Sequence, residues 1–218
     1  MSDEFELLRE RMVTSQIERR GVTNPAVLKA MRSVPRHLFV DPLHQDQAYS
    51  DYPLPIGYDQ TISQPYIVAL MTALLNLKGD EKVLEVGTGS GYQAAVLSML
   101  CDRVHTIELI PQLADHAREL LEKLGYHNVV VHHSDGSLGW EAEAPYDAIM
   151  VTASAPNTPA PLLEQLAPGS RLVIPVGSRG SQWLELWQQE GSTWQPEQIL
   201  PVAFVPLRGR HGWKVEDD

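Results

Sequence analysis

The chain has 218 residues, of which 43% are hydrophobic and 21% are charged. That length and balance fit a compact globular protein with a sizeable core and argue against a disordered chain. The 28 acidic residues outnumber the 17 basic ones and give a formal net charge of -11, which disfavours a nucleic-acid partner because phosphates are repelled.

The apolar residues and the single cysteine exclude further classes. Cys101 has no partner for an internal disulfide and is expected to be a small buried hydrophobe, and no Cys/His cluster suggests a structural metal. Residues 1–11 lack the apolar core of a signal peptide, and no run approaches the ~20 apolar residues of a membrane span. We therefore expect a cytoplasmic protein that binds no membrane.

The apolar spacing predicts helices before residue 79 and alternating strands and helices after it. In chain order, the N-terminal part is expected to form helices over 4–19, 25–32 and 65–77, with a loop over 34–56. The remainder is expected to form strands over 82–86, 103–108, 129–132, 146–151 and 171–176, and helices over 92–100, 112–124 and 160–166. The tail adds strand-like segments over 183–189 and 201–205, and Trp183, Trp187 and Trp194 are expected to fill the core of this hairpin.

This alternation predicts an α/β fold of the Rossmann-like, doubly wound type. The sheet should be mostly parallel, with an antiparallel C-terminal strand and with helices on both faces. Residues 1–78 are expected to form a helical extension that packs on a core of residues 79–218, and the two parts should form a single compact unit.

A glycine-rich loop lies between the strand over 82–86 and the helix over 92–100. Residues 85–91 read Glu-Val-Gly-Thr-Gly-Ser-Gly. Glycines let a ligand lie against bare backbone, and ligands of open α/β sheets bind beyond the carboxyl ends of the strands. A dinucleotide loop normally reads G-x-G-x-x-G, whereas here the third glycine comes one residue early and an acid, Glu85, precedes the first. This pattern resembles the loop of methyltransferases that use S-adenosylmethionine (AdoMet), whose ammonium group Glu85 would attract directly or through water.

Two further acids follow strands. Glu108 ends the next strand and is suited to accept hydrogen bonds from both hydroxyls of a ribose. NAD proteins use the same device, so Glu108 supports a nucleoside ligand without naming it. Asp135, followed by Gly136, comes just after the third strand and is suited to accept the adenine amino group, with an ordinary Asp-Gly turn as the alternative.

Most of the chain resembles one family. Residues 34–40, 48–57, 60–69, 83–93, 146–149, 172–177 and 204–207 are similar to the protein-L-isoaspartate O-methyltransferases, and the resemblance runs from about residue 12 to residue 209. Its most specific part is Thr-Ile-Ser-Gln-Pro over residues 61–65. The resemblance implies methyl transfer from AdoMet to the free α-carboxylate of L-isoaspartyl residues in peptides and proteins, which starts their repair through a succinimide, with S-adenosyl-L-homocysteine as the other product. A monomer without a metal is expected.

The same resemblance implies roles for individual residues. The hydroxyl of Ser63 would orient the substrate carboxylate, with capping of the helix that Pro65 begins as the alternative. The expected cofactor contacts are Gln60, Thr61, Ile62, Ser63, Glu85, Gly87, Thr88, Gly89, Glu108, Leu109, Asp135 and Gly136. Substrate contacts are expected from Ser63, Pro65, Val205 and Leu207, for which plain packing is the alternative.

The implied reaction needs no general base. A carboxylate with an ordinary pKa near ~3.5–4 is already ionised at neutral pH. Catalysis should therefore rest on aligning and desolvating the two reactants. The adjacent His132 and His133 would point to opposite faces of a strand, which argues against a shared metal, and His37 is expected to be structural.

Three residues depart from the family pattern. Asp59 and Ser134 stand where glycine is usual, and Arg208 stands where threonine is usual. They leave open a methyltransferase that acts on another carboxylate or on a small molecule. An NAD-dependent oxidoreductase is disfavoured by the early third glycine, and a non-catalytic AdoMet-binding protein by the presence of Ser63.

Overall fold

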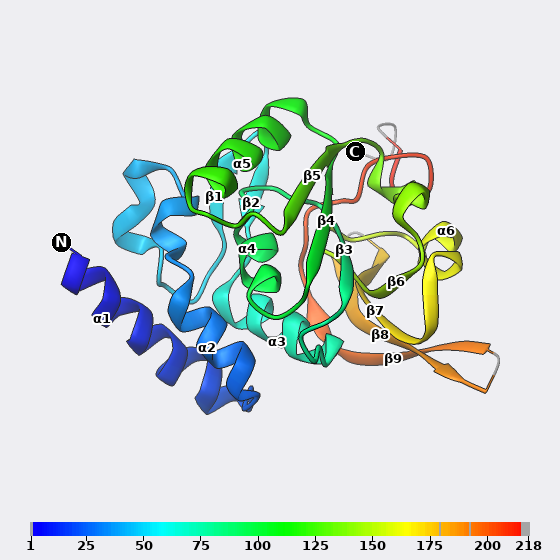
Figure 1. The fold of residues 1–218 in the computed structure, drawn as a ribbon, viewed down its shortest axis with the longest axis horizontal. Coiled ribbons are helices and arrows are strands. Elements are labelled where there is room, and N and C mark those ends of the chain that lie inside the picture. The colour runs from blue at the N-terminus through cyan, green and yellow to red at the C-terminus, as the bar shows by residue number, and fades with distance from the viewer. Residues whose placement is uncertain (1, 179, 192, 215–218) are drawn as a thin grey trace.

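A seven-stranded sheet forms the centre of the computed structural model, which describes residues 2–178, 180–191 and 193–214 (Figure 1). The strand order is β5-β4-β3-β6-β7-β8-β9. The strands are β3 Lys82–Val86, β4 Arg103–Glu108, β5 Val129–His133, β6 Tyr146–Val151, β7 Leu166–Ser178, β8 Ser181–Glu190 and β9 Thr193–Val202. Strands β3 to β7 run parallel to one another, whereas β8 and β9 are antiparallel additions. The predicted fold class is therefore confirmed, with two antiparallel strands after β7.

Helices connect the parallel strands and build the N-terminal part. The α-helices are α1 Ser2–Met12, α2 Pro25–Ser33, α3 Pro65–Leu75, α4 Tyr92–Ser98, α5 Pro111–Lys123 and α6 Ala160–Glu164. Shorter helical turns are η1 Val13–Ile17, η2 Glu18–Arg20, η3 Arg36–Phe39, η4 Pro42–Gln47, η5 Gly136–Leu138 and η6 Glu141–Glu143. Strands β1 Leu54–Gly57 and β2 Gln60–Ile62 form a separate hairpin. The N-terminus of α2 is fixed by Asn24, whose side chain accepts hydrogen bonds from the Ala26 and Val27 amides.

The two faces of the sheet bury separate hydrophobic clusters. Neighbouring positions of β3 alternate between them: Val83 packs with α2 to α5, and Leu84 packs in the cluster that contains Leu162 of α6. Figure 1 shows α4 and α5 on one side of the sheet and α6 on the other. Burial of both faces explains the continuous apolar runs of these strands.

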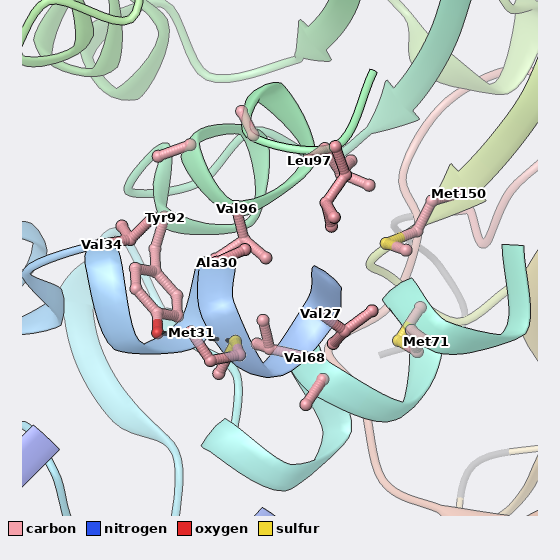
Figure 2. Close-up of a cluster of buried hydrophobic side chains, with 14 of the residues drawn as sticks. Val27, Ala30, Met31, Val34, Val68, Met71, Tyr92, Val96, Leu97 and Met150 are labelled. Carbon is pink, nitrogen blue, oxygen red and sulfur yellow. Dashed lines mark hydrogen bonds between the residues drawn. The ribbon is translucent and has the colours of Figure 1, made fainter. Parts of the chain in front are cut away.

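The N-terminal helices share the larger cluster with the sheet. In Figure 2, side chains of α2 and α3 meet those of α4, and Met150 of β6 belongs to the same buried cluster. All ten labelled side chains are buried. The Tyr92 hydroxyl lies 3.9 Å from the sulfur of Met31, which joins α4 to α2. The extension is thus packed into the core rather than appended to its surface.

Several predicted boundaries were wrong, mainly outside the parallel sheet. The segment over 34–56, predicted as a loop, contains η3, η4 and the strand β1. Residue 166, predicted to end a helix, belongs to β7, which also includes residues 167–170. The last strand spans Thr193–Val202, whereas 201–205 was predicted. Trp187 and Trp194 pack against the smaller cluster, but Trp183 is 38% exposed, so the prediction that it fills a core was wrong. Cys101 is buried as expected, and its thiol lies 3.2 Å from the Leu97 carbonyl oxygen.

We predict that Met31→Ala destabilises the whole chain by about 2–5 kcal/mol, because it empties a site with 0% exposure between the extension and α4. All five tryptophans lie beyond residue 139, so their fluorescence reports unfolding of the core. Their denaturation midpoint should fall together with that of the far-ultraviolet circular dichroism. Leu7→Ala, at a position that is 73% exposed on α1, is the control and should shift neither midpoint. A tryptophan transition that Met31→Ala leaves unmoved would show that the extension unfolds on its own.

Candidate functional site

The strand order reverses direction between β3 and β6. β4 adjoins β3 on one side and β6 adjoins it on the other, so loops leave the carboxyl ends of β3 and β6 in different directions. Such a switch point is where open α/β sheets bind ligands. Gly87 follows β3 and Thr152 follows β6. The Thr152 hydroxyl donates to the Gly87 carbonyl oxygen at 2.6 Å, and a Cβ atom on Gly87 would collide with that hydroxyl.

Backbone conformation explains the glycines of the loop. Gly87 has a φ of 100° and Gly91 a φ of 86°, values that other residues rarely adopt. The amides of Gly87 and Thr88 both donate to the Ile107 carbonyl oxygen, at 2.8 and 3.2 Å, which ties the loop to β4. Gly91 starts α4 beside Leu121 of α5, whose nearest side-chain atom would lie 3.2 Å from an added Cβ. The loop is therefore held closely against β4 and α5. Two of its residues, Gly87 and Gly89, line a hollow at the carboxyl ends of the strands.

Glu108 ends β4 with its carboxylate held by backbone. Its Oε2 atom accepts from the Gly89 amide at 2.8 Å and its Oε1 atom from the Ile110 amide at 3.0 Å. The residue is only 7% exposed, yet it lines the open hollow beside the loop. Each carboxylate oxygen has two lone pairs, so both can still accept a hydrogen bond from a ligand.

We name this hollow the main cleft. Its lining comes from the hairpin, the ends of three strands and the C-terminal segment: Gln60, Thr61, Val86, Gly87, Gly89, Ile107, Glu108, Leu109, Ile110, Gly136, Thr152, Ala153, Val205, Pro206, Leu207 and Arg208. The predicted cofactor contacts Gln60, Thr61, Gly87, Gly89, Glu108, Leu109 and Gly136 are among these residues. Ile62, Ser63 and Thr88 line a smaller hollow that adjoins it.

A second hollow, the side groove, meets the main cleft. It is lined by Arg20, Pro53, Thr61, Ser63, Gln64, Ile67, Thr152, Leu200, Pro201, Val202, Ala203, Phe204 and Val205. Thr61, Thr152 and Val205 line both hollows. A ligand in the main cleft and a ligand in the side groove would therefore come together between these three side chains.

Ser63, the residue predicted to orient the substrate, lies beside the place where the hollows meet. It lines the side groove and the smaller hollow. Helix α3 is capped at Gln64 without a side-chain hydrogen bond, so the alternative in which Ser63 caps this helix does not hold. Within the described part of the chain the Ser63 hydroxyl has no hydrogen-bond partner. Pro65 is buried in the first turn of α3 and lines none of these hollows, whereas Val205 and Leu207 line the main cleft.

Glu85 lies behind the loop and lines none of these hollows. Its side chain is fully buried, and its Oε2 atom accepts from the Thr106 hydroxyl, which in turn contacts the Thr88 hydroxyl at 2.7 Å. Its Oε1 atom has no partner in the described structure. Burial raises the pKa of Glu85 to about 8, because the ionised form loses its hydration.

Asp135 is also engaged within the protein. Its carboxylate accepts from the Ser137 amide and hydroxyl, at 2.9 and 2.7 Å, and from the Arg210 amide at 2.7 Å. It thus fixes the turn η5 and holds the C-terminal segment against it. Its neighbour Gly136 lines the main cleft, whereas Asp135 does not. Contact of Asp135 or Glu85 with a ligand stays a prediction.

Several lining residues were not identified from the sequence, among them Thr152 and Arg20. Thr152 is the first residue after β6, and its position beyond a strand at the switch point was the available signal. Arg20 ends the turn η2 in the N-terminal part, and nothing in its local sequence relates it to a groove formed with residues 200–205.

The three departures from the family pattern have different structural consequences. Asp59 has a φ of 56° in the hairpin turn, a conformation that glycine adopts with less strain. Ser134 has no positive φ, so a serine fits its backbone without strain. Arg208 lines the main cleft, and its Nη1 atom donates to the Lys214 carbonyl oxygen at 3.1 Å.

The histidines have protein partners. His132 shares a 3.1 Å hydrogen bond with His105 and stacks on Trp140, whereas His133 contacts the Leu109 carbonyl oxygen. His37 stacks on Phe5 and bonds the Tyr49 hydroxyl at 2.7 Å, which supports its expected structural role. In the described ranges, no three His, Cys, Asp or Glu side chains are grouped to hold a metal ion. None of the described helices combines the length and the apolar composition of a membrane-spanning helix.

Comparisons with known proteins relate this site to one family. The family model described as protein-L-isoaspartate(D-aspartate) O-methyltransferase matches residues 8–212. Protein-L-isoaspartate O-methyltransferase 1 of Syntrophobacter fumaroxidans is 56% identical over 210 residues, covering 96% of this chain and 98% of the relative. The protein-L-isoaspartate O-methyltransferase of Syntrophotalea carbinolica is 54% identical over 216 residues, covering 99% and 100%.

Solved structures show the same similarity. A protein-L-isoaspartate O-methyltransferase structure matches with a TM-score of 0.84 at 28% identity, covering 94% of this chain and 67% of that chain. A structure from Plasmodium falciparum, described as a protein of this kind in complex with S-adenosyl-L-homocysteine, matches with a TM-score of 0.80 at 25% identity. It covers 92% of this chain and 98% of that one.

We predict that Glu85 makes the protein less stable as the pH rises from about 5 to 8. Its pKa is about 8 in the folded protein and near ~4.5 in the unfolded chain, so the folded state binds the extra proton in this range. The stabilisation is complete below the unfolded pKa and is lost as the pH passes the folded one. Urea unfolding at pH 5 and pH 8 should show a fall in stability of about 1–3 kcal/mol that Glu85→Gln abolishes. Parallel pH profiles for the two proteins would contradict the prediction.

Proposed function

The chain belongs to the protein-L-isoaspartate(D-aspartate) O-methyltransferase family, and we propose that it methylates the free α-carboxylate of L-isoaspartyl residues in peptides and proteins. The methyl donor is AdoMet, which leaves as S-adenosyl-L-homocysteine. The resulting methyl ester closes to a succinimide without enzymatic help, and hydrolysis returns part of it to normal aspartate. The outcome is repair of damaged protein.

One observation carries this proposal: the main cleft and the side groove meet between Thr61 and Thr152. Methyl transfer requires donor and acceptor to approach in line, which favours two hollows that share one opening. The main cleft has the features that a nucleoside needs, namely the carboxylate of Glu108 and bare backbone at Gly87 and Gly136. The side groove is open and largely apolar, which suits a peptide.

The donor side is assigned to residues that line the main cleft or stand directly beside it. Glu108 accepts hydrogen bonds from the ribose hydroxyls, while its hydrogen bonds from two backbone amides hold its carboxylate in place. Leu109 and Gly136 border the base, with Asp135 behind Gly136 as the acceptor of its amino group. The glycine loop is fixed by the hydrogen bond from the Gly89 amide to Glu108 and by the hydrogen bond between the Thr88 and Thr106 hydroxyls. Gln60, Thr61 and Ile62 cover the donor from the hairpin.

Glu85 has a less direct part. Since its side chain lies behind the loop, its attraction for the ammonium group of the donor acts through a water molecule or through the loop. The unpartnered Oε1 atom is available for such a link. A bound cation nearby would favour the ionised carboxylate and lower the pKa of Glu85.

The acceptor side needs orientation rather than activation. A substrate carboxylate is ionised at neutral pH, so no side chain has to remove a proton. The hydroxyl of Ser63 donates to this carboxylate and holds it toward the shared opening. Val205 and Leu207 border the substrate backbone, and Pro65 sets the start of α3 and with it the position of Ser63. Exclusion of water by this lining strengthens the attraction between carboxylate and sulfonium.

We further propose that the enzyme works as a cytoplasmic monomer and requires no metal, nucleic acid or membrane. Residues 1–78 and 79–218 are proposed to act as one unit, since both contribute lining to the side groove.

The test of the function is transfer of labelled methyl groups from AdoMet to two peptides that differ only in L-isoaspartate or normal L-aspartate at one position. We expect label on the isoaspartyl peptide and at most a background level on the other. The label should be released by mild base, as a methyl ester would be. If AdoMet binds but neither peptide is labelled, the acceptor is another carboxylate or a small molecule.

We predict that Ser63→Ala lowers turnover of the isoaspartyl peptide about 10- to 100-fold, because it removes one hydrogen bond to a charged group. AdoMet affinity, measured by calorimetry, should stay within about three-fold, since Ser63 does not line the main cleft. Ser33→Ala on α2 is the matched control and should leave both quantities unchanged. Equal loss of cofactor affinity and turnover in Ser63→Ala would contradict the orienting role.

A further inference from the structure

The side groove carries one positive charge. Arg20 is the only charged residue among the described residues that line it, and the others are apolar or neutral. This contrasts with the chain as a whole, whose formal net charge is -11. An arginine in the lining of a groove favours a negatively charged group nearby.

The guanidinium group of Arg20 is held in place before any ligand arrives. Its central carbon lies 3.5 Å from the centre of the Tyr66 ring, a stacking contact that fixes the plane of the group. Its Nη1 atom pairs with Oδ2 of Asp51 at 3.1 Å. The side chain nevertheless stays 43% exposed. A preorganised cation loses less conformational entropy on binding than a free one does.

The pair with Asp51 leaves part of the guanidinium group available. Arginine has five N–H donors in a planar fork that matches a carboxylate. Across the described ranges, the only hydrogen bond of Arg20 is the one from Nη1. Asp51 is fixed in turn, because its backbone oxygen accepts from the Gln64 side chain at 2.9 Å. Asp51 thus positions Arg20 and also offsets some of its charge.

We propose that Arg20 binds a second carboxylate of the substrate, so that the enzyme prefers isoaspartyl sites with an acidic side chain nearby. The inference rests on the proposed function, in which the reacting carboxylate lies by Ser63 in the same groove. An extended peptide advances about 3.3 Å per residue, so the second carboxylate belongs to a residue close to the isoaspartyl one. Arg20 is a specificity-determining residue and takes no part in the methyl transfer itself.

The experiment compares kcat/KM for isoaspartyl peptides with blocked ends that differ only in Glu or Gln at one flanking position. The substituted position is varied over the three residues on either side of the isoaspartyl residue. For the wild type, the Glu/Gln ratio at the best position should be about three- to five-fold, as expected for a partly exposed ion pair. The ratio should fall toward one in 0.5 M salt because the charges are screened. A further peptide carries Gln at the best position and a free C-terminal carboxylate at the same distance from the isoaspartyl residue. It shows whether Arg20 recognises an acidic side chain or the end of a peptide chain.

Four variants separate recognition from stability. Arg20→Gln should reduce the ratio to about one, and Arg20→Lys should retain part of it. Asp51→Asn should raise the ratio, because the competing internal carboxylate is removed while the shape is kept. Arg32→Gln removes another partly exposed arginine, one that pairs with Glu10 and Glu18 and does not line the side groove, and should leave the ratio unchanged.

The outcomes distinguish the inference from the function on which it rests. A wild-type ratio near one at every position would overturn the role of Arg20. An Arg20→Gln variant that slows all peptides equally, with its ratio intact, would also overturn it and indicate a structural role. A gain from the free C-terminus alone would overturn the preference for acidic side chains. No labelling of any isoaspartyl peptide by the wild type would instead contradict the proposed function.

Discussion

At the carboxyl ends of β3 and β6, the Thr152 hydroxyl bonds the Gly87 carbonyl oxygen at 2.6 Å, and this contact sets the geometry of the site. It holds the glycine loop against the sheet so closely that no Cβ fits at Gly87. The loop in turn places the Gly89 amide on Glu108. Since Thr152 also lines both hollows, the same side chain fixes the donor loop and borders the opening to the acceptor.

The two buried acids near the loop, Glu108 and Glu85, differ in their charge because they have different hydrogen-bond partners. Glu108 accepts two backbone amides and faces the main cleft, so its negative charge is stabilised where a ligand can use it. Glu85 has one hydroxyl partner and is fully buried, and burial raises its pKa. Two ionised carboxylates close together repel each other. Without a bound cation, a protonated Glu85 therefore leaves Glu108 as the charged group of the cleft, and binding of a cation would shift Glu85 toward its ionised form.

How far the sequence predicts this molecule depends on whether a feature is set locally. The parallel strands, the loop and the position of Glu108 at the end of a strand were predicted correctly because apolar runs, glycine spacing and strand ends are local signals. The hairpin β1–β2 was missed because its strands are short, contain Pro55 and end in a turn of two residues with positive φ, Tyr58 and Asp59. Arg20 acquires its place only through long-range packing, whereas the place of Thr152 just after a strand was a local signal that was not used. For Glu85 the sequence indicates an acid near the loop but not the side of the loop on which its carboxylate lies.

The site also depends on packing between the two parts of the chain. The donor side of the main cleft is built mainly from residues after 79, whereas Arg20, Thr61 and Ser63 reach the side groove from residues before 79. These residues keep their positions only while α2 and α3 stay packed on α4 and β6, through the buried cluster in Figure 2. A reaction that relies on alignment, without a general base, is sensitive to small displacements of either reactant. The apolar interface of the extension is therefore as necessary to methyl transfer as the polar groups that contact the substrates.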